Sequence, residues 1–413
     1  MKIIKRLISV TMVCVMLISV TACGGTDRDE EARKLDIETP VTINVWYDNK
    51  DYERYLNTVA SGLKAANPVY IEAQDIIDTL YTETVRNNNA PDVYLMSAEN
   101  SDKAYLLGLM LENDSYGDIY NEKIYGKAAI KSASYKGKLY GYPVSFDMPV
   151  MVYNKKYASS VDSYDEIKQI SDNYQVTEEN QNITKVFDFD ASDMLINYPY
   201  VGRYMDIGGD VSENADIFTI DELKFKRALK EYASLKNTFG IDRNESTHDS
   251  CLDEFTQNKL LYTIVNTSDL KKIDDSGVTY GIIPVPYLSE GLESVPMSIT
   301  TLAVVNPYTS DISVAKTVAR AISYDYAADM QALSGHVSAR ADLIKKGRKA
   351  DNTDYNMLHD IYSDSIVKAK YVGVQNIYTR YEILIHQIWD GKSIDDAYNE
   401  FHKGVESFLT SIR

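Results

Sequence analysis

Cysteine is scarce in this chain, with 3 among 413 residues. Cys14 lies in an apolar run near the N-terminus and Cys23 follows that run, which leaves Cys251 alone in the body of the chain. A single thiol forms neither an intramolecular disulfide nor a cysteine-rich metal site. The fold must therefore be stabilised by its hydrophobic core.

The motifs of common enzymes are also missing. The sequence has no G-x-S-x-G, no H-E-x-x-H, no G-x-x-x-x-G-K-[ST] and no G-x-G-x-x-G. Its 5 histidines are scattered without metal-ligand spacing. We expect no enzyme activity, no cofactor and no metal, although the many carboxylates leave one alternative open, a secreted glycoside hydrolase that uses two acids.

Positive charge is in short supply. The chain has 43 lysines and arginines against 61 aspartates and glutamates, for a net charge of −18. A surface of this sign repels phosphate backbones and anionic lipid. We therefore expect no nucleic-acid partner.

The N-terminus has the features of an export signal. Lys2, Lys5 and Arg6 precede the apolar run 7–20, which is short for a membrane span and typical of a signal peptide. The run leads into Val20-Thr21-Ala22-Cys23-Gly24, which resembles a bacterial lipobox. We expect a signal peptide over 1–22, a lipid on Cys23, a flexible tether over 23–40, and a protein anchored on the outer face of the cell membrane.

Hydrophobic periodicity predicts an α/β fold. The N-terminal part alternates between strand and helix patterns: strands over 41–47, 69–73 and 93–96, and helices over 52–63 and 78–87. The order β-α-β-α-β implies a parallel sheet, whose ligands bind beyond the carboxyl ends of the strands. The loops after Tyr47 and Met96 are therefore candidate site loops.

The second half continues the α/β pattern with more helix. We expect strands over 260–265, 280–285 and 298–305, and helices over 223–235, 315–322 and 394–408. The strand at 298–305 is a candidate connection between domains.

Several segments, in order, resemble the maltose/maltodextrin class of ABC-transporter solute-binding proteins. They are VTINVWYDN, APDVYLMSAENSDKAYLLGLMLEN, YKGKLYGYPVSFDMPVMVYNKKY, EFTQNKLLYTIVNTSDL, GVTYGIIPVPYL, SARADL and IWDGKSIDDAYNEF. Together they span almost all of the chain beyond the signal.

The resemblance implies a two-lobed, periplasmic-binding-protein-like fold with a mainly parallel sheet in each lobe and hinge closure over a cleft. Residues 41–147 and 301–338 would form the N-lobe, and residues 148–300 and 339–413 the C-lobe. It also implies a monomer that delivers a small ligand, a mono- or oligosaccharide, to ABC permease subunits. A surface lipoprotein with an adhesive or structural role is the other alternative.

The same resemblance places ligand contacts after the strands of the N-lobe. Tyr47, Asp48 and Asn49 follow the first strand and Glu99 follows the third. Asp48 and Glu99 are also typical of acids at the start of a helix. Phe146 and Asp147 fall at the first crossover, where hinge packing and a turn acid are the alternatives.

On the C-lobe, the resemblance places contacts at Asp190 and Asp193, at Asn266 and Asp269, and at Tyr378 and Arg380. Many relatives have a sugar-stacking tryptophan where Asp269 stands, so the ligand is expected to differ from maltodextrin. Tyr378 matches a cleft aromatic of the family, which would cover the apolar face of a sugar. Arg380 is suited to a carboxylate of a ligand or of the protein.

Overall fold

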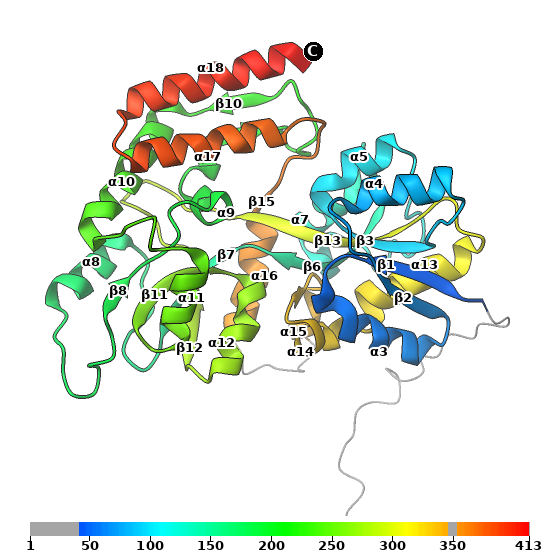
Figure 1. The fold of residues 1–413 in the computed structure, drawn as a ribbon, viewed down its shortest axis with the longest axis horizontal. Coiled ribbons are helices and arrows are strands. Elements are labelled where there is room, and N and C mark those ends of the chain that lie inside the picture. The colour runs from blue at the N-terminus through cyan, green and yellow to red at the C-terminus, as the bar shows by residue number, and fades with distance from the viewer. Residues whose placement is uncertain (1–40, 346–352, 413) are drawn as a thin grey trace, which may run out of the picture.

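The computed structural model describes residues 41–345 and 353–412. They form two lobes side by side, each a sheet flanked by helices (Figure 1). The signal, Cys23 and the tether lie outside the described residues. None of the helices within these ranges is long and apolar enough to cross a membrane.

The N-lobe is built on a seven-stranded sheet of order β14-β6-β13-β3-β1-β2, with β15 paired to β13. Its strands are β1 (Ile43–Tyr47), β2 (Ala66–Tyr70), β3 (Val93–Ser97), β6 (Gly141–Asp147), β13 (Met297–Val305) and β14 (Val337–Ser338). The remaining strand, β15 (Ile366–Val367), pairs with Met297 and Ser298 at the start of β13, where the two lobes meet. Its main helices are α3 (Glu53–Leu63), α4 (Ile76–Tyr81), α5 (Ser101–Leu106), α7 (Lys127–Ala133), α13 (Ile312–Arg320) and α14 (Met330–Ser334).

The first unit of this lobe follows the predicted β-α-β-α-β order. β1 pairs in parallel with both β2 and β3, as the alternating pattern predicted. On α3, Tyr55, Leu56, Val59 and Leu63 recur at helical spacing and are all buried. Because parallel strands end at one edge of a sheet, the loops after Tyr47 and Ser97 lie on the same side.

The C-lobe is built on a four-stranded sheet of order β12-β7-β11-β8. Its strands are β7 (Pro149–Asn154), β8 (Lys185–Phe187), β11 (Leu260–Asn266) and β12 (Tyr280–Ile283). Its main helices are α8 (Tyr164–Asn173), α9 (Met194–Asn197), α10 (Glu222–Phe239), α11 (His248–Thr256), α12 (Leu270–Ser276), α17 (Gln375–Trp389) and α18 (Ile394–Ile412). A short hairpin of β9 (Met205–Ile207) and β10 (Phe218–Ile220) completes it.

The expectation of mainly parallel sheets is wrong. In the N-lobe β13 pairs antiparallel with β3 and β6, and β14 pairs antiparallel with β6. In the C-lobe β7 pairs antiparallel with both of its neighbours, β11 and β12, and the one parallel pair among the described strands is β8 with β11. A chain that leaves one lobe and later returns must cross in both directions, which makes the connecting strands antiparallel.

The lobes are joined by strands that continue from one sheet toward the other. β6 ends at Asp147 and β7 begins at Pro149, so Met148 alone separates the two sheets. β13 crosses in the reverse direction through the middle of the molecule (Figure 1), and its N-lobe pairing with β6 begins at Ile299.

A helix that the sequence analysis did not single out packs at this junction. α16 (Thr353–Asp364) contacts α7 of the N-lobe and β12 of the C-lobe. Its Tyr362 ring stacks on Phe146 with 3.9 Å between centroids and 6° between planes. The buried cluster around it includes residues of both lobes, so the core is continuous through the hinge.

Candidate functional site

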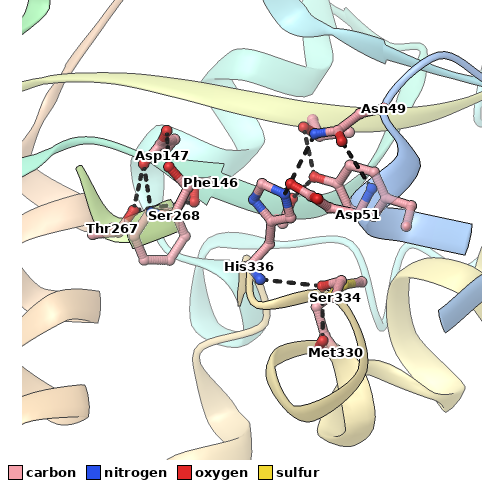
Figure 2. Close-up of polar contacts among 12 residues, drawn as sticks. Asn49, Asp51, Phe146, Asp147, Thr267, Ser268, Met330, Ser334 and His336 are labelled. Carbon is pink, nitrogen blue, oxygen red and sulfur yellow. Dashed lines mark hydrogen bonds and ion pairs between the residues drawn. The ribbon is translucent and has the colours of Figure 1, made fainter. Parts of the chain in front are cut away.

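Asp147 connects the two lobes at the first crossover. Its carboxylate accepts hydrogen bonds from Thr267 Oγ1 (2.9 Å), from the Ser268 amide (3.0 Å) and from Ser268 Oγ (2.9 Å), as Figure 2 shows. Thr267 and Ser268 follow β11, and their place at its carboxyl end brings them to the hinge. Charge-assisted bonds of this kind are strong and fix the position of the loop.

Phe146, the neighbouring candidate, is a core residue. It is 1% exposed, and its ring stacks on Tyr362. It also makes a T-shaped contact with the His359 ring, with centroids 5.5 Å apart. This placement corresponds to the hinge-packing alternative.

Three candidate residues of the C-lobe belong to one hydrogen-bonded group: Asp190, Asn266 and Asp269. Asp269 Oδ2 accepts from the Asn266 amide (2.8 Å) and lies 2.9 Å from His248 Nε2. Asp190 Oδ2 accepts from the His248 amide (2.9 Å). The bond to Asp269 raises the pKa of His248, and burial opposes that effect.

Asp193 takes a local structural position. Its carboxylate accepts from the Ile196 amide (2.9 Å) and caps α9. Asp190 likewise accepts from the amides of Ser192 and Asp193, so both acids shape the loop that carries them.

The loop after β1 divides its candidates between core and surface. Tyr47 is 3% exposed and packs edge-on against Tyr70 at 5.8 Å, whereas Asp48 and Asn49 are exposed. Although the Asp48 side chain reaches solvent, surrounding atoms partly desolvate its carboxylate and raise its pKa, and the charge of Asp75 raises it further. Asn49, not Asp48, caps the following turn, since its Oδ1 accepts from the Asp51 amide (2.9 Å).

His336 stands beside this loop. Its Nε2 lies 3.3 Å from Asp51 Oδ2 and 3.5 Å from Asn49 Nδ2 (Figure 2). Its ring stacks on Tyr52 with centroids 4.7 Å apart. Neither His336 nor His248 was predicted as a site residue, because the histidines are scattered in the sequence. Their roles depend on partners far away in the sequence.

Glu99 forms a contact between the lobes. It lies in the 3₁₀ turn η3 (Ala98–Asn100) after β3, and its Oε2 is paired with Lys368 Nζ. Lys368 belongs to the segment 368–374 that leads into α17 of the C-lobe. Ser97 Oγ donates to the other carboxylate oxygen of Glu99 at 3.3 Å.

A cavity of about 920 Å³ opens between these elements. The N-lobe contributes α4, η3 and α5 to its wall, and the C-lobe contributes the segment 368–375; the wall includes Glu99, Lys103, Leu106, Lys368, Tyr371 and Val372. A volume near this value and lining from two lobes are typical of small-molecule sites. Leu106 and Val372, one from each lobe, are well exposed and add apolar surface.

Tyr378 and Arg380 occupy different surroundings on α17. Tyr378 is 1% exposed, its hydroxyl accepts from the Ala369 amide (2.9 Å), and the Lys368 ammonium lies 5.3 Å from its ring centroid. Arg380 packs against Gly404 of α18. The structure therefore buries Tyr378 behind Lys368, outside the lining of the cavity, and places Arg380 on the side of α17 that faces α18.

Among the described residues, no group of three or more histidine, cysteine, aspartate or glutamate side chains could hold a metal ion. The lone thiol of Cys251 is buried. Burial raises its pKa beyond the usual range, so it stays protonated.

Comparisons with known proteins agree with this geometry. A model of the bacterial extracellular solute-binding protein family matches residues 62–354. A curated relative, the diacetylchitobiose binding protein DasA of Streptomyces coelicolor, is 26% identical over 160 residues, which is 37% of each chain.

Solved structures share the fold at low sequence identity. A cyclo/maltodextrin-binding protein complexed with maltotetraose superposes with a TM-score of 0.75 at 14% identity, over 91% of this chain and 99% of that one. An extracellular solute-binding protein from Staphylococcus aureus in complex with maltose gives a TM-score of 0.74 at 15% identity, with the same coverage. The predicted two-lobed α/β fold is confirmed, and the chain belongs to the bacterial extracellular solute-binding protein family.

Proposed function

We propose that this protein binds a saccharide between its lobes and delivers it to an ABC importer. The cavity lined by both lobes carries the proposal, because a ligand there touches both walls only when the lobes are together. The sugars named for the matched proteins, maltose, maltotetraose and diacetylchitobiose, support a saccharide as ligand. Of the contact residues predicted from the sequence, Glu99 alone lines this cavity. The others remain proposed contacts outside it: Asp48, Asp147, Asp190, Asp193, Asn266 and Asp269.

The proposal assigns residues to lobes as the sequence analysis did, with α16 as a junction helix. Residues 41–147 and 301–338 would form the N-lobe, and residues 148–300 and 339–413 the C-lobe, of which 346–352 and 413 lie outside the described residues. Permease subunits are the proposed partners, and the protein acts as a monomer.

A thermal-shift screen tests the ligand class. A ligand that binds only the folded protein raises the melting temperature by mass action. We expect at least one of maltose, maltotetraose and diacetylchitobiose to raise it in a saturable way, and an anionic control, glucuronate, to leave it unchanged. If the purified protein alone cleaved the oligosaccharide, the glycoside hydrolase would replace this proposal, and no shift with any saccharide would reject it.

The proposal includes a lipid anchor on Cys23, supported by the lipobox-like segment and by the charged tether that follows it. Replacing Cys23 by serine removes the thiol that would carry the lipid, so we expect the variant to leave the membrane fraction. Cell fractionation with immunoblotting measures this, and Cys251→Ser serves as the control that stays attached. A Cys23→Ser protein that remains with the membranes would refute the anchor.

A further inference from the structure

The Glu99–Lys368 pair occupies the place where a stacked aromatic ring was expected. The Lys368 ammonium lies over the Tyr378 ring, 5.3 Å from its centroid, and is held there by Glu99. Tyr378 is 1% exposed, so a sugar cannot lie on its face while Lys368 covers it. The group that a ligand meets at this wall is the ammonium of Lys368, with the Glu99 carboxylate beside it.

The two side chains differ in exposure in a way that suits a binding role. Lys368 is 10% exposed at its side chain and Glu99 is 31% exposed, and both line the cavity. A buried ammonium needs partners for its three N–H groups. The Glu99 carboxylate and the Tyr378 ring do not use all three, so Lys368 can still donate a hydrogen bond to a ligand. Glu99 also retains acceptor capacity, because its oxygens have about four acceptor positions.

The chemistry of the pair indicates the ligand it fits. An ammonium only donates hydrogen bonds and a carboxylate only accepts them, whereas a hydroxyl group does both. Two adjacent hydroxyls can therefore bridge the pair, one accepting from Lys368 and one donating to Glu99. Because the two charges cancel and the whole chain carries −18, a neutral ligand is favoured over an anionic one.

The neighbouring lysines are already engaged elsewhere. Lys103 is paired with Asp75 (2.6 Å) and Asp78 (2.8 Å) on its own lobe. Lys370 is buried and donates to the carbonyls of Lys131 of α7 (2.7 Å) and of Ser134, with Glu213 at 3.6 Å. Lys368 differs from both. Among the described residues its acid partner is Glu99, which lies on the opposite lobe.

We infer that Lys368 is a specificity-determining residue of the cleft, which together with Glu99 receives adjacent hydroxyl groups of a neutral saccharide. Tyr378 supports the ammonium from behind. This role rests on the proposed saccharide function. Lys368 and Glu99 would be the residues that distinguish one saccharide from another.

Calorimetric titration with maltotetraose and with diacetylchitobiose tests it. Charge-assisted hydrogen bonds are worth enough that Lys368→Met should weaken binding about tenfold or more, while Lys368→Arg, which keeps the charge, should restore most of it. Lys230→Met, at an exposed site on α10, is the matched control and should bind as the wild type does. A folded Lys368→Met protein that binds within about twofold of the wild type overturns the inference.

A second readout needs no saccharide. Lys368 should react with an amine-labelling reagent far more slowly than exposed Lys230, and Glu99→Gln should speed its labelling, as mass spectrometry would show. Labelling of wild-type Lys368 as fast as that of Lys230 would show that the pair is absent and would overturn the inference by itself. If neither saccharide bound the wild type but Lys368 were protected, the saccharide function would fail while the ion pair stood.

Discussion

Replacing Tyr362 by alanine is expected to destabilise the protein by about 3–5 kcal/mol, the usual cost of removing a large buried aromatic side chain. The ring is fully buried, stacks on Phe146 and lies where both lobes contribute to one core. Urea unfolding monitored by circular dichroism measures the loss.

Tyr362→Phe is the matched control for this substitution. It removes only the hydroxyl, which lies 2.7 Å from Thr300 Oγ1, and Thr300 keeps its bond to Ser132 Oγ (2.9 Å). We expect a loss of about 0.5–1.5 kcal/mol, the net value of one hydrogen bond. Equal losses for the two variants would contradict the claim that the stacked ring stabilises the hinge.

Acid is expected to destabilise the protein through His359, which lies on the same helix. Burial lowers the pKa of His359 to about 4, so the folded protein holds it neutral. The unfolded chain takes up the proton near pH 6.5, and stability therefore falls as the pH drops from about 6.5 to about 4. One pKa unit corresponds to about 1.4 kcal/mol, which makes the full effect about 3 kcal/mol.

The comparison of His359→Leu with the wild type isolates this effect. The free energy of unfolding of the variant should lose less between pH 6.5 and 4 than that of the wild type. His402→Gln, at a partly exposed position on α18, should show the same loss of unfolding free energy between pH 6.5 and 4 as the wild type. If His359→Leu and the wild type lost the same free energy over this range, His359 would not be the buried group responsible.

The regular parts of the fold could be predicted because their signals are local. Alternation in β1 and the helical spacing of Tyr55, Leu56, Val59 and Leu63 depend only on neighbouring residues. The antiparallel pairing of β13 could not be derived in this way, because it depends on segments far apart in the chain. The expected strand at 69–73 is found at Ala66–Tyr70, a shift of the kind expected at element boundaries.

The candidate site was predicted in the same uneven way. The loops after Tyr47 and Ser97 lie on one side of the N-lobe sheet, as expected where the carboxyl ends of parallel strands meet. Which atoms face one another was beyond the sequence: the pairing of Glu99 with Lys368 joins residues 269 positions apart. Likewise, the stacking of Phe146 on Tyr362 requires α16 to pack at the hinge, and no local pattern specifies that packing.

Small-angle X-ray scattering of the purified protein, with and without the saccharide that raises its melting temperature most, tests closure directly. Because the proposed ligand contacts both lobes only when they are together, the account predicts a smaller radius of gyration and a shorter maximum dimension in the bound form. Saturating saccharide that leaves both dimensions and the scattering profile unchanged would contradict binding by closure of the two lobes.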